Sequence, residues 1–205
     1  VAHNSMFEEG AREVTCESCH ETVPSNAAHT QHGADLACAA CHMETAVTCV
    51  NCHFEAEIEE HRKVAYGKFS GWQILGNFNG KVHPVNFQSV KYGDETFVAY
   101  GPFTGHSITA EARDCSECHG NPYAQQYLAQ GFLKLVEWDA QSRTLVPLQG
   151  VIPLPPDFTT GLIHDFVTYA GGQWSFLETG PDRAHMLFGE PLTREQIQAL
   201  ADPGN

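Results

Sequence analysis

Four copies of the pattern Cys-x-x-Cys-His carry the chemistry that this sequence can be expected to perform. A c-type haem is attached when two thiols add across its vinyl groups and the histidine that follows binds one axial face of the iron. On one helical turn, residues three and four apart share a face, so both sulfurs can reach the porphyrin edge while the histidine points at the metal. The motifs predict four haems, with thioether bonds from Cys16, Cys19, Cys38, Cys41, Cys49, Cys52, Cys115 and Cys118 and proximal iron ligands His20, His42, His53 and His119.

Disulfide bonds in a secreted chain and four-cysteine zinc sites are the other common uses of Cys-x-x-Cys pairs. The histidine after each pair argues against both. Histidine makes up 12 of 205 residues, so its chance occurrence after all four pairs has a probability of about 1 in 100,000. All eight cysteines lie in the four motifs, which leaves none for another kind of site.

The composition narrows the classes of partner and location. The chain has 25 acidic and 11 basic residues and a formal net charge of −14, which argues against nucleic acids and anionic membrane surfaces as partners. No run of 18 apolar residues is present, so no membrane span is expected. The chain begins at Val1 without a charged and apolar leader, as expected of a processed N-terminus. Because haem c is attached outside the cytoplasmic membrane, the cell surface or extracellular space is the expected location, with the periplasm as the alternative.

The number of haems also shapes the predicted fold. At roughly 50 residues per haem, the cofactors are expected to form much of the core. The predicted fold is therefore a mostly irregular multihaem c-type cytochrome with short helices and small antiparallel β-sheets. Residues 1–120 are predicted to bind the haems and to contain a small β insert at about 64–105. Residues 121–205 are predicted to form a haem-free, β-containing segment packed on that region.

Local patterns predict individual elements within this frame. Turn signals at Asn79-Gly80 and Gly93-Asp94 separate runs rich in β-branched and aromatic residues, which predicts an antiparallel meander. Later in the chain, a hairpin is expected at 131–152 and two further strands at 163–170 and 173–178. Helices are expected at 54–63, from Asn121-Pro122 to about 130, and at 193–201, where Thr193 and Gln196 can form a capping box.

The distal faces of the four irons need ligands as well. Methionine can serve, but only Met6, Met43 and Met186 are present, so two histidines are expected on each iron. Beyond the four proximal residues, the histidines that remain are His3, His29, His32, His61, His83, His106, His164 and His185.

Spacing ranks these histidines. His29 and His106 each precede a motif by nine residues, so both are predicted to be ligands. His32 shares a helical face with His29 and could reach a different haem of the closely spaced pair formed by the second and third motifs. His3 lies near the chain end, and is either a solvated terminal residue or a ligand that crosses to the next subunit. His83 and His61 are the alternatives for this fourth position, and His164 and His185 are expected to be structural.

Residues 29–55, 80–121 and 191–200 resemble the multihaem cytochromes that polymerise into extracellular nanowires, in particular the tetrahaem outer-surface kind. The resemblance implies that every haem has two histidine ligands, that the haems form a continuous chain, and that one distal histidine comes from the neighbouring subunit. Carried onto this sequence, it implies His29, His32 and His106 as distal ligands within the chain. It implies His3, with His83 as the alternative, as the ligand that crosses the interface.

Three functions follow from these observations. The first is electron transfer through four haems in the repeating subunit of an extracellular filament, with other redox proteins or extracellular electron acceptors as further partners. The second is a soluble periplasmic tetrahaem electron shuttle, and the third is a multihaem reductase. A reductase needs an open position on an iron, and iron with two histidine ligands has none. The expected protein is therefore not an enzyme.

Overall fold

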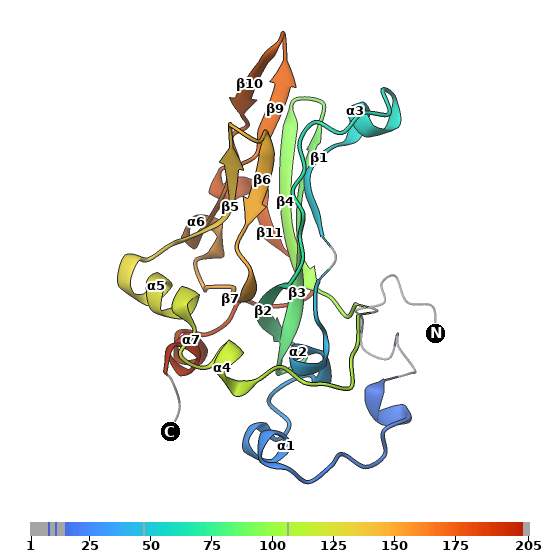
Figure 1. Cartoon of the computed structure of the whole chain (residues 1–205), viewed down its shortest axis with the longest axis vertical. Coiled ribbons are helices and arrows are strands. Elements are labelled where there is room, and N and C mark those ends of the chain that lie inside the picture. The colour runs from blue at the N-terminus through green and yellow to red at the C-terminus, as the bar shows by residue number, and fades with distance from the viewer. Residues whose placement is uncertain (1–7, 9–10, 12–14, 47, 106, 203–205) are drawn as a thin grey trace.

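The computed structural model of the chain describes residues 8, 11, 15–46, 48–105 and 107–202. His3 and His106, both predicted ligands, lie outside the described residues. Strands make up most of the body, and α1, α2, α4, α5 and α7 gather at one end of it (Figure 1). Across the described ranges, no helix is long and apolar enough to cross a membrane.

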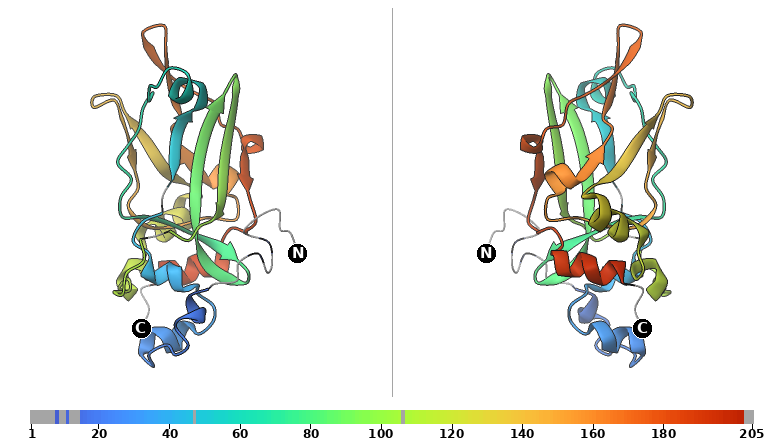
Figure 2. Two further views of the ribbon diagram at one scale, coloured as in Figure 1. Left: turned by 90° about the vertical axis from the view of Figure 1, so that its right-hand side faces the viewer. Right: turned by 90° about the vertical axis from the view of Figure 1, so that its left-hand side faces the viewer.

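The largest sheet combines strands from both halves of the chain. Its order is β11-β4-β3-β2-β7, with β1 paired to β3 in addition. The central strands β2, β3 and β4 pair antiparallel, whereas β1, β7 and β11 each join in parallel. The two longest strands, β3 and β4, lie side by side in Figure 2. The bounds are β1 Cys49–His53, β2 Trp72–Phe78, β3 Lys81–Tyr92, β4 Glu95–Pro102, β7 Gly150–Pro153 and β11 Ala184–Met186.

Turn chemistry explains the centre of this sheet. The turn between β2 and β3 needs two residues with positive φ, and Asn79 (φ 51°) and Gly80 (φ 74°) supply them. Gly93 (φ 56°) opens the next turn in the same conformation. The predicted antiparallel meander is therefore confirmed.

Two smaller sheets follow. Strands β5 and β6 form an antiparallel hairpin, and β8 pairs with β5 in parallel. Strands β9 and β10 form a second hairpin, which turns at Gly171 and Gly172. The hairpin predicted at 131–152 is confirmed, but β7 leaves it to join the largest sheet. The strand predicted at 173–178 is confirmed as β10, whereas the one predicted at 163–170 is divided between β8 and β9. The bounds are β5 Leu133–Asp139, β6 Thr144–Pro147, β8 Leu162–His164, β9 Val167–Ala170 and β10 Gln173–Phe176.

The helices are short and begin at recognisable caps. Helix α5 follows Asn121, whose side-chain oxygen accepts hydrogen bonds from the backbone of Tyr123 and Ala124. Helix α7 follows Thr193, which forms the predicted capping box with Gln196. Both predicted helices are confirmed, and the one expected at 54–63 is shorter than predicted. The bounds are η1 Cys16–Ser18, α1 Ala27–His32, α2 Cys38–His42, α3 Phe54–Ile58, α4 Cys115–Cys118, α5 Pro122–Gln130, α6 Phe158–Gly161, η2 Pro181–Arg183 and α7 Arg194–Ala201.

The predicted fold class is wrong. The described residues form a mixed α/β structure whose largest sheet contains both parallel and antiparallel pairs, rather than an irregular chain with small antiparallel sheets. The expectation that haems form much of the core is also wrong, because side chains of the paired strands fill it. Strands β7 and β11 are distant in sequence from the central strands and extend the sheet at both edges. The number of residues per haem gave no indication of this larger sheet. Fully buried side chains include Trp72, Ile74, Phe87, Tyr100, Leu133, Leu135, Ile152 and Leu154.

Candidate functional site

The second motif forms helix α2 and presents its chemistry outward. Ala39 and Ala40, the two residues between its cysteines, are buried in the core, whereas Cys38 is exposed and Cys41 is half-buried. The Nδ1 atom of His42 donates a hydrogen bond to the carbonyl oxygen of Thr109 over 3.1 Å. A metal-binding histidine usually donates one ring N–H to such an acceptor, which leaves the other nitrogen for the metal. The Nε2 atom of His42 is therefore the nitrogen that could bind an iron.

A second histidine ring faces His42. The ring centres of His29 and His42 lie 6.2 Å apart, with 25° between their planes. An imidazole nitrogen lies about 2 Å from a metal that it binds and its ring centre about 1 Å further, so two rings on opposite faces of one iron have centres about 6 Å apart. The Nδ1 atom of His29 donates to the carbonyl oxygen of Pro24 over 2.9 Å. Both rings therefore have the spacing and the orienting hydrogen bond of a pair of axial ligands.

The fourth motif forms a second pair of the same kind. The ring centres of His32 and His119 lie 5.9 Å apart, with 12° between their planes. The Nδ1 atom of His119 donates to the carbonyl oxygen of Ala199 over 3.2 Å. Helix α4 carries Cys115 and Cys118, and His119 follows directly. The residues of the second and fourth motifs thus fit an iron with two histidine ligands.

One short helix supplies both facing rings. Asn26 caps α1 by accepting a hydrogen bond from the backbone of His29, and the helix ends at Gly33 (φ 52°). His29 and His32 lie one turn apart on it, so they share a face. The sequence suggested that His32 could reach a haem of the pair formed by the second and third motifs, but the structure places it opposite the fourth motif. Which motif lies opposite His32 depends on the path that the chain takes between residues 54 and 114.

The third motif has a different conformation. A helical turn was expected for every motif, and this expectation is wrong for Cys49–His53, which forms strand β1 beside β3. Asn51 has a left-handed backbone (φ 57°), and its side-chain oxygen accepts a hydrogen bond from the backbone of Val167. The Nε2 atom of His53 donates a hydrogen bond to the carbonyl oxygen of Val167 over 2.8 Å. Because Nε2 carries the proton of that hydrogen bond, the third motif does not fit a haem in this arrangement.

The first motif begins in the 3-10 helix η1, and its residues Cys16, Cys19 and His20 are all exposed. The first motif therefore presents both thiols and its histidine to solvent.

The remaining histidines have other surroundings. His83 is buried against Phe78, and its Nδ1 atom donates to the carbonyl oxygen of Pro84 over 2.8 Å. His61 is exposed beyond α3, and the ring of His185 stacks on Phe97. Within the described part of the chain, none of these three rings is placed opposite a proximal histidine in the way that His29 and His32 are.

The second and fourth motifs are neighbours. The pKa of the Cys118 thiol is raised to about 11, chiefly by burial and next by the negative charge of a nearby Cys41 thiolate. The side chains of Gln73 and Arg113 connect the two motifs, and sequence analysis singled out neither. Gln73 is a polar residue within the apolar run at 72–75, and that position was the available signal, since buried polar side chains have hydrogen-bond partners.

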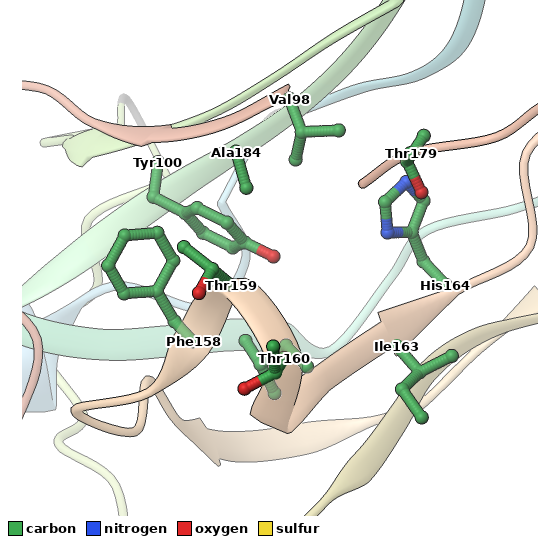
Figure 3. A pocket seen from close by; sticks show the side chains of 10 residues that line it. Val98, Tyr100, Phe158, Thr159, Thr160, Ile163, His164, Thr179 and Ala184 are labelled. Atoms are coloured by element: carbon green, nitrogen blue, oxygen red, sulfur yellow. The ribbon is translucent and has the colours of Figure 1, made fainter. Parts of the chain in front are cut away.

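His164 lines a cavity of about 100 Å³ together with Tyr100 and Thr179 (Figure 3). Cavities that hold organic ligands have volumes of about 300 to 1,000 Å³, so this one is too small for a haem. Among all described residues, those of the haem motifs included, no group of three or more histidine, cysteine, aspartate or glutamate side chains is placed so that it could hold a metal ion.

Burial of His164 makes stability depend on pH. It lowers the pKa of this histidine from 6.5 to about 4, against the opposing charge of Asp165. The unfolded chain binds a proton here below pH 6.5, whereas the folded chain does so only near pH 4. Because the unfolded state holds more protons in this window, the free energy of unfolding should fall by up to about 3 kcal/mol as the pH falls from 6.5 to 4.

The variant His164→Leu is expected to reduce this dependence, as measured by denaturant unfolding from pH 7 to pH 4. His53, whose pKa burial also lowers, remains in both proteins, so the comparison isolates His164. The exposed His185→Leu change is the control. The prediction would be contradicted if the free energy of unfolding changed equally with pH in the His164→Leu variant and in the unmodified chain.

Comparison with known proteins adds no assignment. No family model matches the chain, and no curated protein or solved structure matches it. The geometry of the motifs is therefore the basis for a functional conclusion.

Proposed function

We propose that this chain is an electron-transfer protein that carries four c-type haems and is the repeating subunit of an extracellular cytochrome filament. One observation carries the proposal: the two facing ring pairs, His29 with His42 and His32 with His119, have the separation of axial ligands on a single iron. Each pair includes the histidine of a Cys-x-x-Cys-His motif whose cysteines can hold the porphyrin edge.

A haem bound in this way supplies an iron that gains or loses one electron. The protein's own residues hold the rings in place. The backbone carbonyl groups of Pro24, Thr109 and Ala199 accept the Nδ1 hydrogens of three of these rings and fix their orientation. Two histidines on one iron leave no position for a substrate, which favours electron transfer over bond chemistry.

The resemblance to filament-forming cytochromes supports assembly into a homopolymer. His3 and His106 are proposed as distal ligands for the other haems, His3 being donated to the neighbouring subunit. Other redox proteins or extracellular acceptors would receive the electrons at the cell surface.

Electron microscopy of protein taken from the native cell surface without denaturant tests the polymer. Filaments with a regular repeat are expected. Dispersed monomers that contain haem would contradict the filament and support a soluble periplasmic shuttle. Carbon monoxide binding to a haem of the reduced native protein would contradict complete histidine ligation and support a reductase, since only an open iron position binds it.

The number of haems tests the third motif separately. Haem attachment at Cys49 and Cys52 requires His53 to give up its hydrogen bond to Val167 before Nε2 can bind iron. We expect the intact mass and the pyridine haemochrome spectrum to report four haems per chain. A count of three, with Cys49 and Cys52 open to alkylation after denaturation, would show that the third motif keeps its strand arrangement.

A further inference from the structure

Arg113 lies between the second and fourth motifs. Its side chain is 11% exposed, although the chain as a whole carries a formal charge of −14. Its backbone N–H donates to the carbonyl oxygen of Cys41 over 3.0 Å, and Cys115 follows it by two residues. Arg113 therefore adjoins both motifs through the main chain.

The guanidinium group bonds to both motifs as well. Its Nη2 atom donates to the carbonyl oxygens of Met43 over 3.0 Å and Glu44 over 2.6 Å, the two residues after His42. Its Nη1 atom donates to the carboxylate of Glu117 over 2.8 Å, within the fourth motif. The planar fork of an arginine can serve several acceptors at once, which the single ammonium group of lysine cannot do in the same geometry.

Gln73 extends this contact into the core. The Nε atom of Arg113 donates to its side-chain oxygen. The Nε2 atom of Gln73 donates in turn to the carbonyl oxygens of Ala39 and Ala40, at 3.2 Å each. These alanines lie between the cysteines of the second motif, and Gln73 is fully buried in strand β2. The side chain of Arg113 is thereby tied to a rigid part of the sheet.

We propose that Arg113 and Gln73 form a clamp that sets the position of the second haem motif relative to the fourth, and that the charge of Arg113 favours the reduced state of the two haems held there. This inference rests on the proposed function. Helix α1 supplies the facing rings of both sites from the opposite side, so the clamp and α1 together determine the spacing between the two haems.

The burial of Arg113 determines how strongly its charge acts on the two haems. Each iron gains one electron from a neighbouring haem or an external one-electron donor, and no bond forms or breaks. A positive charge with little solvent around it stabilises the added negative charge. The carboxylate of Glu117, which opposes it, is 44% exposed, so solvent screens the carboxylate more than it screens Arg113. Arg113 and Glu117 together therefore produce a net positive electrostatic potential at the two haems.

Two variants of the haem-loaded full chain separate charge from geometry. Arg113→Gln removes the charge and most of the hydrogen bonds, whereas Arg113→Lys keeps the charge and loses the fork. Arg183→Gln is the control, because it removes an equal charge from an exposed ion pair with Glu95. All three are compared with the unmodified chain by spectroelectrochemical titration of the four haems. Electron paramagnetic resonance of the oxidised haems reports the interaction between neighbouring irons.

In Arg113→Gln, the reduction equilibrium of two of the four haems is expected to become about tenfold less favourable, which for a one-electron couple corresponds to about 59 mV. Arg113→Lys should shift these potentials less, and Arg183→Gln should shift none. The magnetic interaction between the two haems should change in both Arg113 variants, because neither keeps the fork.

Unchanged potentials in an Arg113→Gln protein that holds all its haems would overturn the charge role. An unchanged magnetic interaction in haem-loaded Arg113→Lys would overturn the clamp, and this variant keeps the test decisive if Arg113→Gln does not fold. An unmodified chain that contains no haem would instead overturn the proposed function.

Discussion

Replacing both His29 and His32 by alanine is expected to leave two of the four haems with one open axial position each. The thioether bonds and proximal histidines are untouched, so the haem content should stay the same. The two irons should become high-spin and bind carbon monoxide when reduced, because each loses the ring that faces its proximal ligand. Alanine favours helix, so α1 should persist in the variant.

The single variants separate the two sites. His29→Ala should open the haem of the second motif, and His32→Ala that of the fourth. In a chain that lacks Cys115 and Cys118, His32→Ala should add no carbon monoxide binding, whereas His29→Ala still should. In a chain that lacks Cys38 and Cys41, the two results should be exchanged.

The control for these spectra is His61→Ala, an exposed histidine outside the facing pairs. It should leave all haems low-spin. If His32→Ala still opened a haem in the chain without Cys115 and Cys118, His32 would serve another motif, as the sequence alone had suggested. Low-spin spectra from the double variant would contradict both facing pairs.

Truncating Phe87 to alanine is expected to lower the free energy of unfolding by about 3 to 5 kcal/mol. Phe87 is fully buried, and its ring centre lies 5.3 Å from that of Tyr100 and 6.2 Å from that of Trp72. If side chains form the core, the cavity left by this ring removes contacts that a haem on the periphery cannot replace. Denaturant unfolding of the haem-loaded chain, followed by circular dichroism, measures the loss.

The matched control is Phe176→Ala in the hairpin of β9 and β10. Phe176 is 64% exposed, so its truncation should change the free energy of unfolding by no more than about 0.5 kcal/mol. Equal small losses for both variants would mean that the haems, and not the sheet, supply most of the stability. The side-chain core of the mixed α/β fold would then not account for the stability of this protein.

Local structure could be predicted from the sequence because short-range chemistry determines it. The Asn79-Gly80 turn, the Asn121 cap and the Thr193 capping box each involve residues within a few positions of one another. Such contacts depend on φ preferences and side-chain donors that can be read from the residue types. The helix predicted at 54–63 begins at the expected residue but ends at Ile58, and His61 beyond it has a left-handed backbone (φ 51°), which the charged pattern does not indicate.

The conformation of the third motif could not be predicted in this way. Cys49–His53 repeats the spacing of the other motifs, yet it is a strand, because β3 offers it a parallel partner and Val167 bonds both to Asn51 and to His53. Those partners lie 38 to 116 residues away along the chain. Spacing within a motif carries no information about contacts at that distance.

The sequence by itself determined the chemical inventory of this protein: eight thiols and four histidines at the spacing of haem attachment, a net negative charge and the local turns and caps. Only the tertiary structure decided which histidine faces which motif, that Arg113 and Gln73 join two motifs, and that β7 and β11 complete a sheet with its own core. The physical reason is that residue types define which contacts can form, whereas the return path of the chain, stabilised by burying apolar side chains, selects which of them do form.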